Sequence, residues 1–262
     1  MNITILGCHG SDLSPDGDKT CNPYRSVGFL VNESLLIDAG TVASCLTLAA
    51  QLKIRHVLLS HFHMDHVKEL PALAVNVSGI FKQSIVVASV ASVLKGLKTY
   101  IFNDYVFPNF FKLPDPETSV LSEQVLIPAQ TVSLGGINVT PIFVNHVVPT
   151  VGYILEDQSS TVVFSGDTHA TEEIWVRARK VRNLKHVFIE TSFPNEMAEI
   201  AKKSQHLTPA LLAKEFSKIG KPDLPLSVFH LNPKYRTQIV SQLAQLVIPN
   251  LNVPREGDNL QI

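Results

Sequence analysis

His61-Phe62-His63-Met64-Asp65-His66 brings three imidazoles and a carboxylate together within six residues. Neutral imidazole nitrogens and carboxylate oxygens are the ligands that suit zinc and the neighbouring first-row metals, so this stretch predicts a metal site. An apolar run at 57–59 precedes it, and Pro71 with an apolar stretch follows it. This pattern predicts the end of a strand, then a ligand loop, then a helix. The alternative is a polar turn with a chance cluster of histidines, but ligands at this spacing are more specific than one histidine pair.

The composition is that of an ordinary globular protein that can bury a large core. The chain has 262 residues, of which 45% are hydrophobic and 17% are charged, and no linker or repeat divides it, so we expect one domain over 1–262. A net charge of −1 argues against a broad surface for nucleic acid, but not against a small phosphate-bearing substrate. Cys8, Cys21 and Cys45 form no metal-type spacing, which favours a reduced cytoplasmic location. We expect no signal peptide and no membrane span.

The first fifth of the chain predicts three strands and a helix. Apolar runs at 3–6, 27–31 and 34–38 are typical of strands, and the last two are joined by a turn. Asp38 follows the third run and is interpreted as a structural turn residue. Residues 41–53 have apolar side chains at helical spacing and predict an amphipathic helix.

Four later apolar runs each lead into a residue that could bind a metal or move a proton. The runs are 142–144 before His146, 162–164 before Asp167, 187–189 before Glu190, and 226–229 before His230. Such runs predict buried strands, and polar groups at the carboxyl ends of strands are where α/β proteins place their sites. For any single residue a cap or turn role is favoured. Together with the first cluster, the repeated pattern predicts one site.

These residues, in this order, resemble the metallo-β-lactamase superfamily over nearly the whole chain. The resemblance implies an α/β fold, a four-layer αββα sandwich of two mixed β-sheets flanked by helices, with a dinuclear metal site at one edge. It assigns one divalent ion to His61, His63 and His146, and the second to Asp65, His66 and His230, with Asp167 as the bridge. Two ions per chain are expected, Zn²⁺ first, with Mn²⁺ or Fe²⁺ as alternatives.

A narrower resemblance is to the bacterial class II 3′,5′-cyclic-nucleotide phosphodiesterases. It rests on NHVVP (145–149), VGY (151–153), SGDT (165–168), IETSF (189–193), HLTP (206–209) and YIFNDY (100–105). By similarity to ribonuclease Z, it implies that Glu190 orients His206 beside the metals. The chain departs from the family at His169, where glycine is usual, and at 67–69.

The resemblance implies hydrolysis of cAMP or cGMP to nucleoside 5′-monophosphates. A hydroxide bridging the metals would attack phosphorus, with Asp65 as ligand and orienting group. The 3′-oxygen is a poor leaving group, so His206 is the expected proton donor. The alternative for His206 is a residue at the start of a helix, without a catalytic role. Arg25, Asn145 and His169 are expected substrate contacts.

Three other functions stay open. A ribonuclease Z-like enzyme would need a basic, glycine-rich arm for RNA, and we find none. A thioester or lactone hydrolase would use the same metals but would not need Glu190 and His206. A sensor or scaffold without activity would have lost ligands, whereas all seven positions are filled.

Further side chains carry weaker expectations. His9 and His169 are expected in loops near the site, with a surface position favoured over substrate contact. The aromatic residues at 100–111 could stack a purine or form a lid, but core or subunit packing is favoured. Trp175 is expected on a helix packed against the sheet. Related enzymes suggest a homodimer, and no extended nucleic acid or membrane partner is expected.

Overall fold

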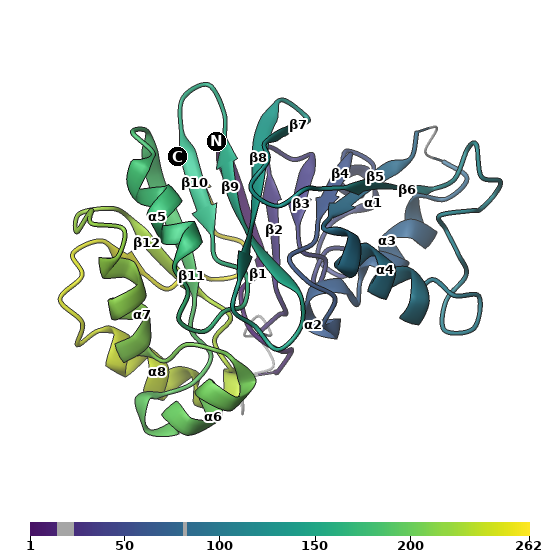
Figure 1. Ribbon diagram of the computed structural model, residues 1–262. Coiled ribbons are helices and arrows are strands. Elements are labelled where there is room, and N and C mark those ends of the chain that lie inside the picture. The colour runs from purple at the N-terminus through teal and green to yellow at the C-terminus, as the bar shows by residue number, and fades with distance from the viewer. Residues whose placement is uncertain (15–23, 81–82) are drawn as a thin grey trace.

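The computed structural model describes residues 1–14, 24–80 and 83–262. These residues form two mixed seven-stranded sheets, which lie face to face with helices outside each (Figure 1). The first sheet contains β1 (Asn2–Gly7), β2 (Gly28–Val31), β3 (Leu35–Ile37), β4 (His56–Leu58), β5 (Ile85–Ser89), β6 (Leu121–Val125) and β14 (Asn259–Gln261). The second contains β7 (Val132–Leu134), β8 (Ile137–Val144), β9 (Thr150–Glu156), β10 (Thr161–Phe164), β11 (Leu184–Glu190), β12 (Leu226–Phe229) and β13 (Leu251–Asn252).

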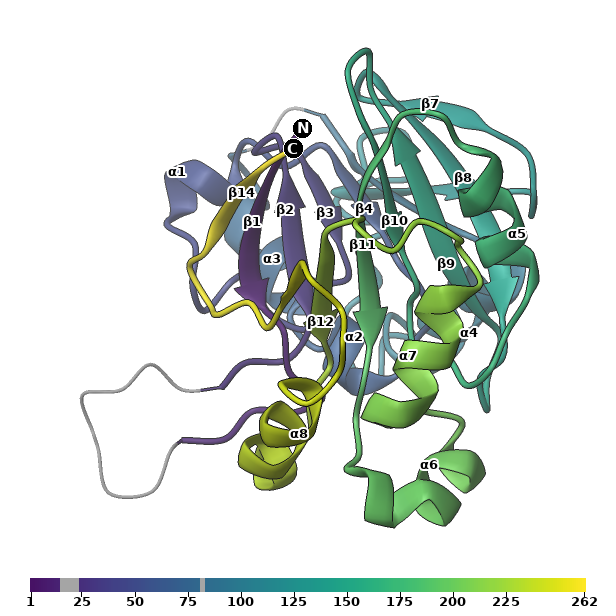
Figure 2. The same ribbon diagram turned by 90° about the vertical axis from the view of Figure 1, so that its left-hand side faces the viewer.

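Each sheet is part antiparallel and part parallel. The first has the order β14-β1-β2-β3-β4-β5-β6, with parallel pairing from β3 to β6. The second has the order β13-β12-β11-β10-β9-β8-β7, with parallel pairing from β13 to β10. Strands β1 and β14, from opposite ends of the chain, pair at one edge (Figure 2). The expected four-layer sandwich is therefore confirmed.

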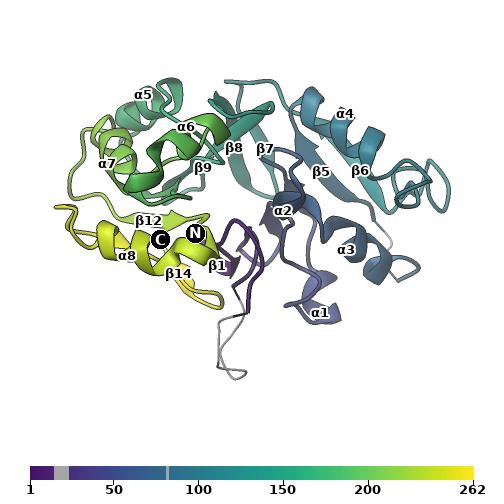
Figure 3. The ribbon, with the colours of Figure 1, turned by 90° about the horizontal axis from the view of Figure 1, so that it is seen from below.

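The helices form the two outer layers (Figure 3). The first sheet is flanked by α1 (Leu48–Gln51), α3 (Leu70–Val77) and α4 (Ala91–Tyr100), with α2 (Met64–Val67) at its lower edge in the view of Figure 1. The second is flanked by α5 (Glu173–Lys180), α7 (Pro209–Ser217) and α8 (Arg236–Leu243), with α6 (Ala198–Ser204) at its lower edge. In the described part of the chain, no helix combines the length and the apolar character required to cross a bilayer.

The predicted helix over 41–53 is wrong in extent, because only Leu48–Gln51 is helical. One oxygen of the Glu69 carboxylate accepts the backbone N–H groups of Val42 at 2.7 Å and Ser44 at 3.0 Å, which holds the preceding segment in turns. The Thr47 side chain then caps the short helix by accepting from the backbone of Ala50. Cys21 lies outside the described residues, and Cys8 and Cys45 are free thiols.

Aromatic packing joins the two sheets in the interior. The Phe29 ring of β2 lies 5.2–5.4 Å, centre to centre, from the rings of Phe164, Phe188 and Phe229, which come from β10, β11 and β12. The carboxyl ends of these three strands carry Asp167, Glu190 and His230, which are predicted site residues. On the outer face of the second sheet, Trp175 of α5 is buried, as predicted. Its indole N–H donates to Glu215 Oε2 at 2.7 Å.

Replacing Phe29 with alanine should lower the free energy of unfolding by about 3–5 kcal/mol, because the cavity would lie between the sheets. Chemical denaturation followed by circular dichroism measures this change. Phe143→Ala is the matched control and should have a smaller effect, since 47% of that side chain is exposed. Equal losses in the two variants would contradict the role given to Phe29.

Candidate metal centre

The fold brings the carboxyl ends of strands from both sheets to one edge, which faces the viewer in Figure 3. His61 follows β4, His146 follows β8, Asp167 follows β10, and His230 follows β12. Helix α2, which begins within the first cluster, places Asp65 and His66 at the same edge. Residues that are far apart in the sequence therefore meet where the strands end.

The predicted ligands form two groups that share one residue. In each group, every residue offers one nitrogen or oxygen atom, and these atoms all lie within 4.8 Å of one another. The first group is His61, His63, His146 and Asp167, and the second is Asp65, His66, Asp167 and His230. His230 Nε2 lies 3.1 Å from both Asp65 Oδ2 and Asp167 Oδ2. The structure thus brings together all seven residues named from the sequence.

Unpartnered polar atoms at the centre of this cluster test whether it fits metal ions. His61 Nε2, His66 Nε2 and Asp167 Oδ1 are buried and make no hydrogen bond. Leaving such an atom unsatisfied costs about 1–3 kcal/mol each, so native structures rarely tolerate several together. A divalent ion would satisfy them, and imidazole with carboxylate is a donor set that zinc and similar metals accept. The residues therefore fit the expected ions.

Outer contacts turn the imidazole rings toward the cluster. His66 Nδ1 donates to Asp38 Oδ2 at 2.7 Å, and His146 Nδ1 donates to the backbone oxygen of Gln205 at 3.1 Å. With the proton on Nδ1, the Nε2 lone pair is free to bind an ion. Asp38 is therefore more than the turn residue predicted from the sequence, although it does occupy a left-handed turn with φ of 54°. Because Asp38 directly follows β3 and so lies at the same edge of the sheet, its place in the sequence could have indicated a role in the site.

Burial and charge set the protonation of the cluster. Burial lowers the pKa of His61 well below its ordinary value, and burial also lowers the pKa of His146, which keeps these rings neutral. Burial opposes ionisation of Asp167, but the neighbouring His230 and His66 outweigh it and hold the pKa of that carboxyl well below its usual range. Burial opposes protonation of His66, but the carboxylates of Asp167, Asp38 and Asp65 outweigh it and raise the pKa of that ring well above its ordinary value. Metals bind neutral imidazoles and ionised carboxylates, so an ion at this group would displace the His66 proton.

Glu190 and His206 form a second arrangement beside both groups. His206 Nδ1 donates to Glu190 Oε1 at 2.7 Å, and the rings of His146 and His230 lie 5.0 and 5.1 Å from the His206 ring. Burial opposes protonation of His206, yet the Glu190 charge and hydrogen bond raise its pKa to about 9. The helix-start alternative is not favoured, because Thr208 caps α7.

The three residues expected to contact substrate, Asn145, His169 and Arg25, each make a hydrogen bond within the protein. The Asn145 side chain donates to the backbone of Ala170 at 2.6 Å, and His169 Nδ1 donates to the backbone oxygen of His206 at 2.8 Å. The Arg25 guanidinium donates to Ser44 Oγ at 2.9 Å, and no contact with the seven cluster residues is described for it.

His9 is not at the surface, so that prediction is wrong. Its side chain is buried, and its Nδ1 lies 2.7 Å from Glu256 Oε1. Backbone pairing with Ser26 and Leu231 holds the segment inside the fold.

The aromatic residues at 100–111 divide between two environments, because Phe102 and Phe110 join the core whereas Tyr105 is 98% exposed.

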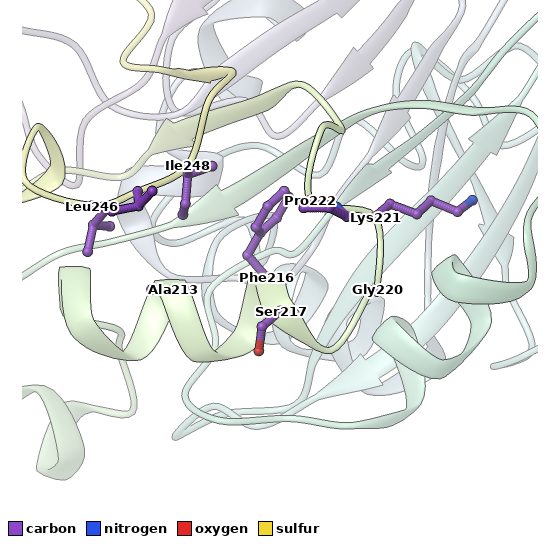
Figure 4. Close-up of a pocket in the computed structure, with 9 residues that line it drawn as sticks. Ala213, Phe216, Ser217, Gly220, Lys221, Pro222, Leu246 and Ile248 are labelled. Atoms are coloured by element: carbon purple, nitrogen blue, oxygen red, sulfur yellow. The ribbon is translucent and has the colours of Figure 1, made fainter.

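An apolar pocket of about 300 Å³ lies apart from these groups, between α7 and the segment at 246–248 (Figure 4). Its lining includes Phe216, Leu246 and Ile248, and contains no histidine, cysteine or carboxylate. It therefore offers no ligand set that could compete with the cluster as the metal centre.

Comparison with known proteins identifies relatives in sequence and in fold. A family model described as a beta-lactamase superfamily domain matches residues 34–230. An uncharacterized protein of Mycobacterium tuberculosis is 27% identical over 194 residues, which cover 69% of this chain and 65% of that protein. One of Mycobacterium leprae is 25% identical over 186 residues, covering 68% of this chain and 62% of that protein. The chain thus spans less than two-thirds of the length of these relatives.

Solved structures share the fold at low identity. Unliganded yeast PDE1 has a TM-score of 0.81 and 16% identity, covering 100% of this chain and 99% of its own. The metallo-beta-lactamase fold protein YhfI of Bacillus subtilis has a TM-score of 0.75 and 18% identity, covering 99% of both chains. The short form of human tRNase Z has a TM-score of 0.68 and 15% identity, covering 100% of this chain and 99% of its own. At such identities the likeness concerns the fold alone.

His61→Ala should lower the affinity for divalent metal by more than about tenfold, since even outer contacts to metal ligands contribute about 10–100-fold. Elemental analysis after dialysis against a metal buffer measures the bound ions. His186→Ala is the control, because its buried ring bonds to Ser227 Oγ at 2.9 Å and not to the cluster. Unchanged metal content in His61→Ala would contradict the ligand assignment.

Proposed function

The chain belongs to the beta-lactamase superfamily domain family, and from this premise we propose that it is a dinuclear metal phosphodiesterase. Its substrates would be 3′,5′-cyclic nucleotides, cAMP or cGMP, and its products nucleoside 5′-monophosphates. The observation that carries the proposal is the 2.7 Å contact between Glu190 and His206, beside two groups of ligand-type residues.

The two groups would hold the metal ions. His61, His63 and His146 would bind one ion, Asp65, His66 and His230 the other, and Asp167 both. Divalent ions bound there would supply an ionised water at neutral pH and would neutralise charge on the phosphoryl group. Zn²⁺ suits these ligands, and Mn²⁺ or Fe²⁺ would also be accepted. Asp65 faces the shared edge with its Oδ2 toward His230, where it can also orient a water.

His206 would act as the general acid. Opening a cyclic phosphodiester releases a 3′-alkoxide, which needs a proton as the bond to phosphorus breaks. The raised pKa of His206, about 9, keeps the ring protonated at neutral pH, and buried Glu190 fixes its orientation. A positioned acid of this kind typically contributes about 10²–10⁴-fold to the rate.

The same residues weigh against the alternatives. A thioester releases a thiolate, which is a better leaving group than an alkoxide and gains little from the proton of His206. An RNA nuclease needs extended basic surface, whereas this chain has a net charge of −1. The similar fold of human tRNase Z keeps the nuclease as the second candidate.

A substrate panel tests the proposal directly. Purified metal-loaded protein should hydrolyse cAMP or cGMP to the 5′-monophosphate, and should be much less active on a structured RNA and on a thioester. Chromatography of the products distinguishes 5′- from 3′-monophosphates. Turnover of the thioester alone, or of RNA alone, would refute the cyclic-nucleotide activity.

His206→Ala should lower kcat by about 10²–10⁴-fold, because the leaving oxygen would lose its proton donor. The bound metal should stay near the level of the unaltered protein, since His206 belongs to neither group that shares Asp167. Steady-state kinetics and elemental analysis measure the two quantities. His56→Ala, at the start of β4, is the matched histidine control. An unchanged kcat in His206→Ala would remove this residue from catalysis.

A further inference from the structure

Ser192 lies between the Glu190–His206 pair and His230, a member of the second group of predicted metal ligands. It is two residues beyond Glu190, the last residue of β11, and only 3% of it is exposed. Its backbone N–H donates to Leu207 at 3.1 Å, next to His206 in the sequence, and its backbone oxygen accepts from Asn232 at 3.4 Å. One short segment is therefore hydrogen-bonded to both loops that carry His206 and His230.

The Ser192 hydroxyl is close both to the Glu190–His206 pair and to the predicted ligand His230. Its Oγ lies 2.8 Å from His230 Nδ1, 3.1 Å from Glu190 Oε2 and 3.2 Å from His206 Nδ1. It also lies 3.1 Å from the backbone oxygen of His230. A hydroxyl has one proton to donate and two lone pairs to accept with, so these contacts cannot all be equivalent.

The chemistry of the neighbours assigns the proton positions. An ionised carboxylate can only accept a hydrogen bond, so the Ser192 hydroxyl donates toward Glu190 Oε2. The backbone oxygen of His230 is a second acceptor for the same proton. His230 Nε2 faces Asp65 and Asp167 and must present a lone pair to bind an ion there. The proton of a neutral His230 ring is then on Nδ1, and Ser192 Oγ is its acceptor. His206 Nδ1 donates mainly to Glu190 Oε1, which is closer at 2.7 Å.

We propose that Ser192 is a positioning residue that holds His230 in its metal-binding tautomer and links that ligand to the Glu190–His206 pair. The link to turnover rests on the proposed function, whereas the effect on metal affinity does not. Glu190 also accepts from the backbone N–H groups of Thr168 and Leu207, so it keeps partners without the hydroxyl. Among the described residues, His230 Nδ1 has Ser192 as its hydrogen-bond partner. Loss of the hydroxyl should therefore affect the ligand more than the carboxylate.

Ser192→Ala should weaken binding of one of two zinc ions by about 10–100-fold, the range found when an outer contact to a metal ligand is removed. Zinc affinity is measured by competition with a coloured chelator, starting from metal-free full-length protein. Thr191→Val is the matched control, because it removes the neighbouring buried hydroxyl, which donates to the backbone oxygen of Glu190. That variant should keep the affinity for both ions. Ser192→Thr, which retains a hydroxyl, should recover most of the lost affinity.

Kinetics with cAMP add a second measurement. At saturating zinc, Ser192→Ala should lower kcat with little change in KM, because the hydroxyl orients groups without binding substrate. If the unaltered protein does not hydrolyse cyclic nucleotides, the proposed function fails, but the zinc titration still decides the role of Ser192. Equal zinc affinities for Ser192→Ala and the unaltered protein would overturn the inference. An equal loss in Thr191→Val would also overturn it, since the effect would then be structural.

A measurement on the unaltered protein decides the matter if Ser192→Ala does not fold. With zinc bound, nuclear magnetic resonance should find the His230 Nδ1 proton protected from exchange with solvent and close to the Ser192 side chain. A His230 ring that carries its proton on Nε2, or one whose Nδ1 proton exchanges freely, would exclude the proposed contact.

Discussion

The burial of three ligand-type atoms without hydrogen-bond partners is the constraint on which this structure depends. His61 Nε2, His66 Nε2 and Asp167 Oδ1 come from segments after β4 and β10 and from α2, so both sheets contribute to one polar centre. Away from this edge, the rings around Phe29 join the sheets by apolar packing. The interior around Phe29 and the polar edge are stabilised in different ways. Apolar packing excludes water from the interior, whereas the edge buries polar atoms that a bound cation would satisfy.

The same edge contains three residues with a left-handed backbone conformation. Asp38, Gln205 and His230 are non-glycine residues with φ of 54°, 57° and 63°. Such conformations cost of order 1–3 kcal/mol each and persist where the surrounding contacts determine them. Gln205 adopts this conformation as the C-cap of α6, and its carbonyl accepts from His146, while the Asp38 carboxylate accepts from His66. These left-handed residues therefore lie among the contacts that orient the imidazoles.

The local pattern of the sequence determined the strands and the position of the site, but not the contacts that support it. Apolar runs followed by His146, Asp167 and His230 sufficed, because the end of a buried strand fixes which edge a residue occupies. The helix over 41–53 was predicted too long, because the turns before Leu48 are held by Glu69, a residue distant in the sequence whose carboxylate accepts from Val42 and Ser44. The contact of Asp38 with His66 and that of Ser192 with His230 also depend on tertiary approach. A short pattern contains no record of such partners.

The segment from Gln205 to Leu207 connects the proposed proton donor to the rest of the centre. The Gln205 carbonyl accepts from His146, the next residue pairs with Glu190, and the Leu207 N–H donates to the same carboxylate. Any shift of this segment would move a ligand of the first group and the acid together. Ser192 makes the corresponding connection to His230 in the second group. A donor fixed relative to both groups is of most use when the leaving oxygen is a strong base. For that reason the arrangement supports the proposed phosphodiester substrate over an ester whose leaving group departs unaided.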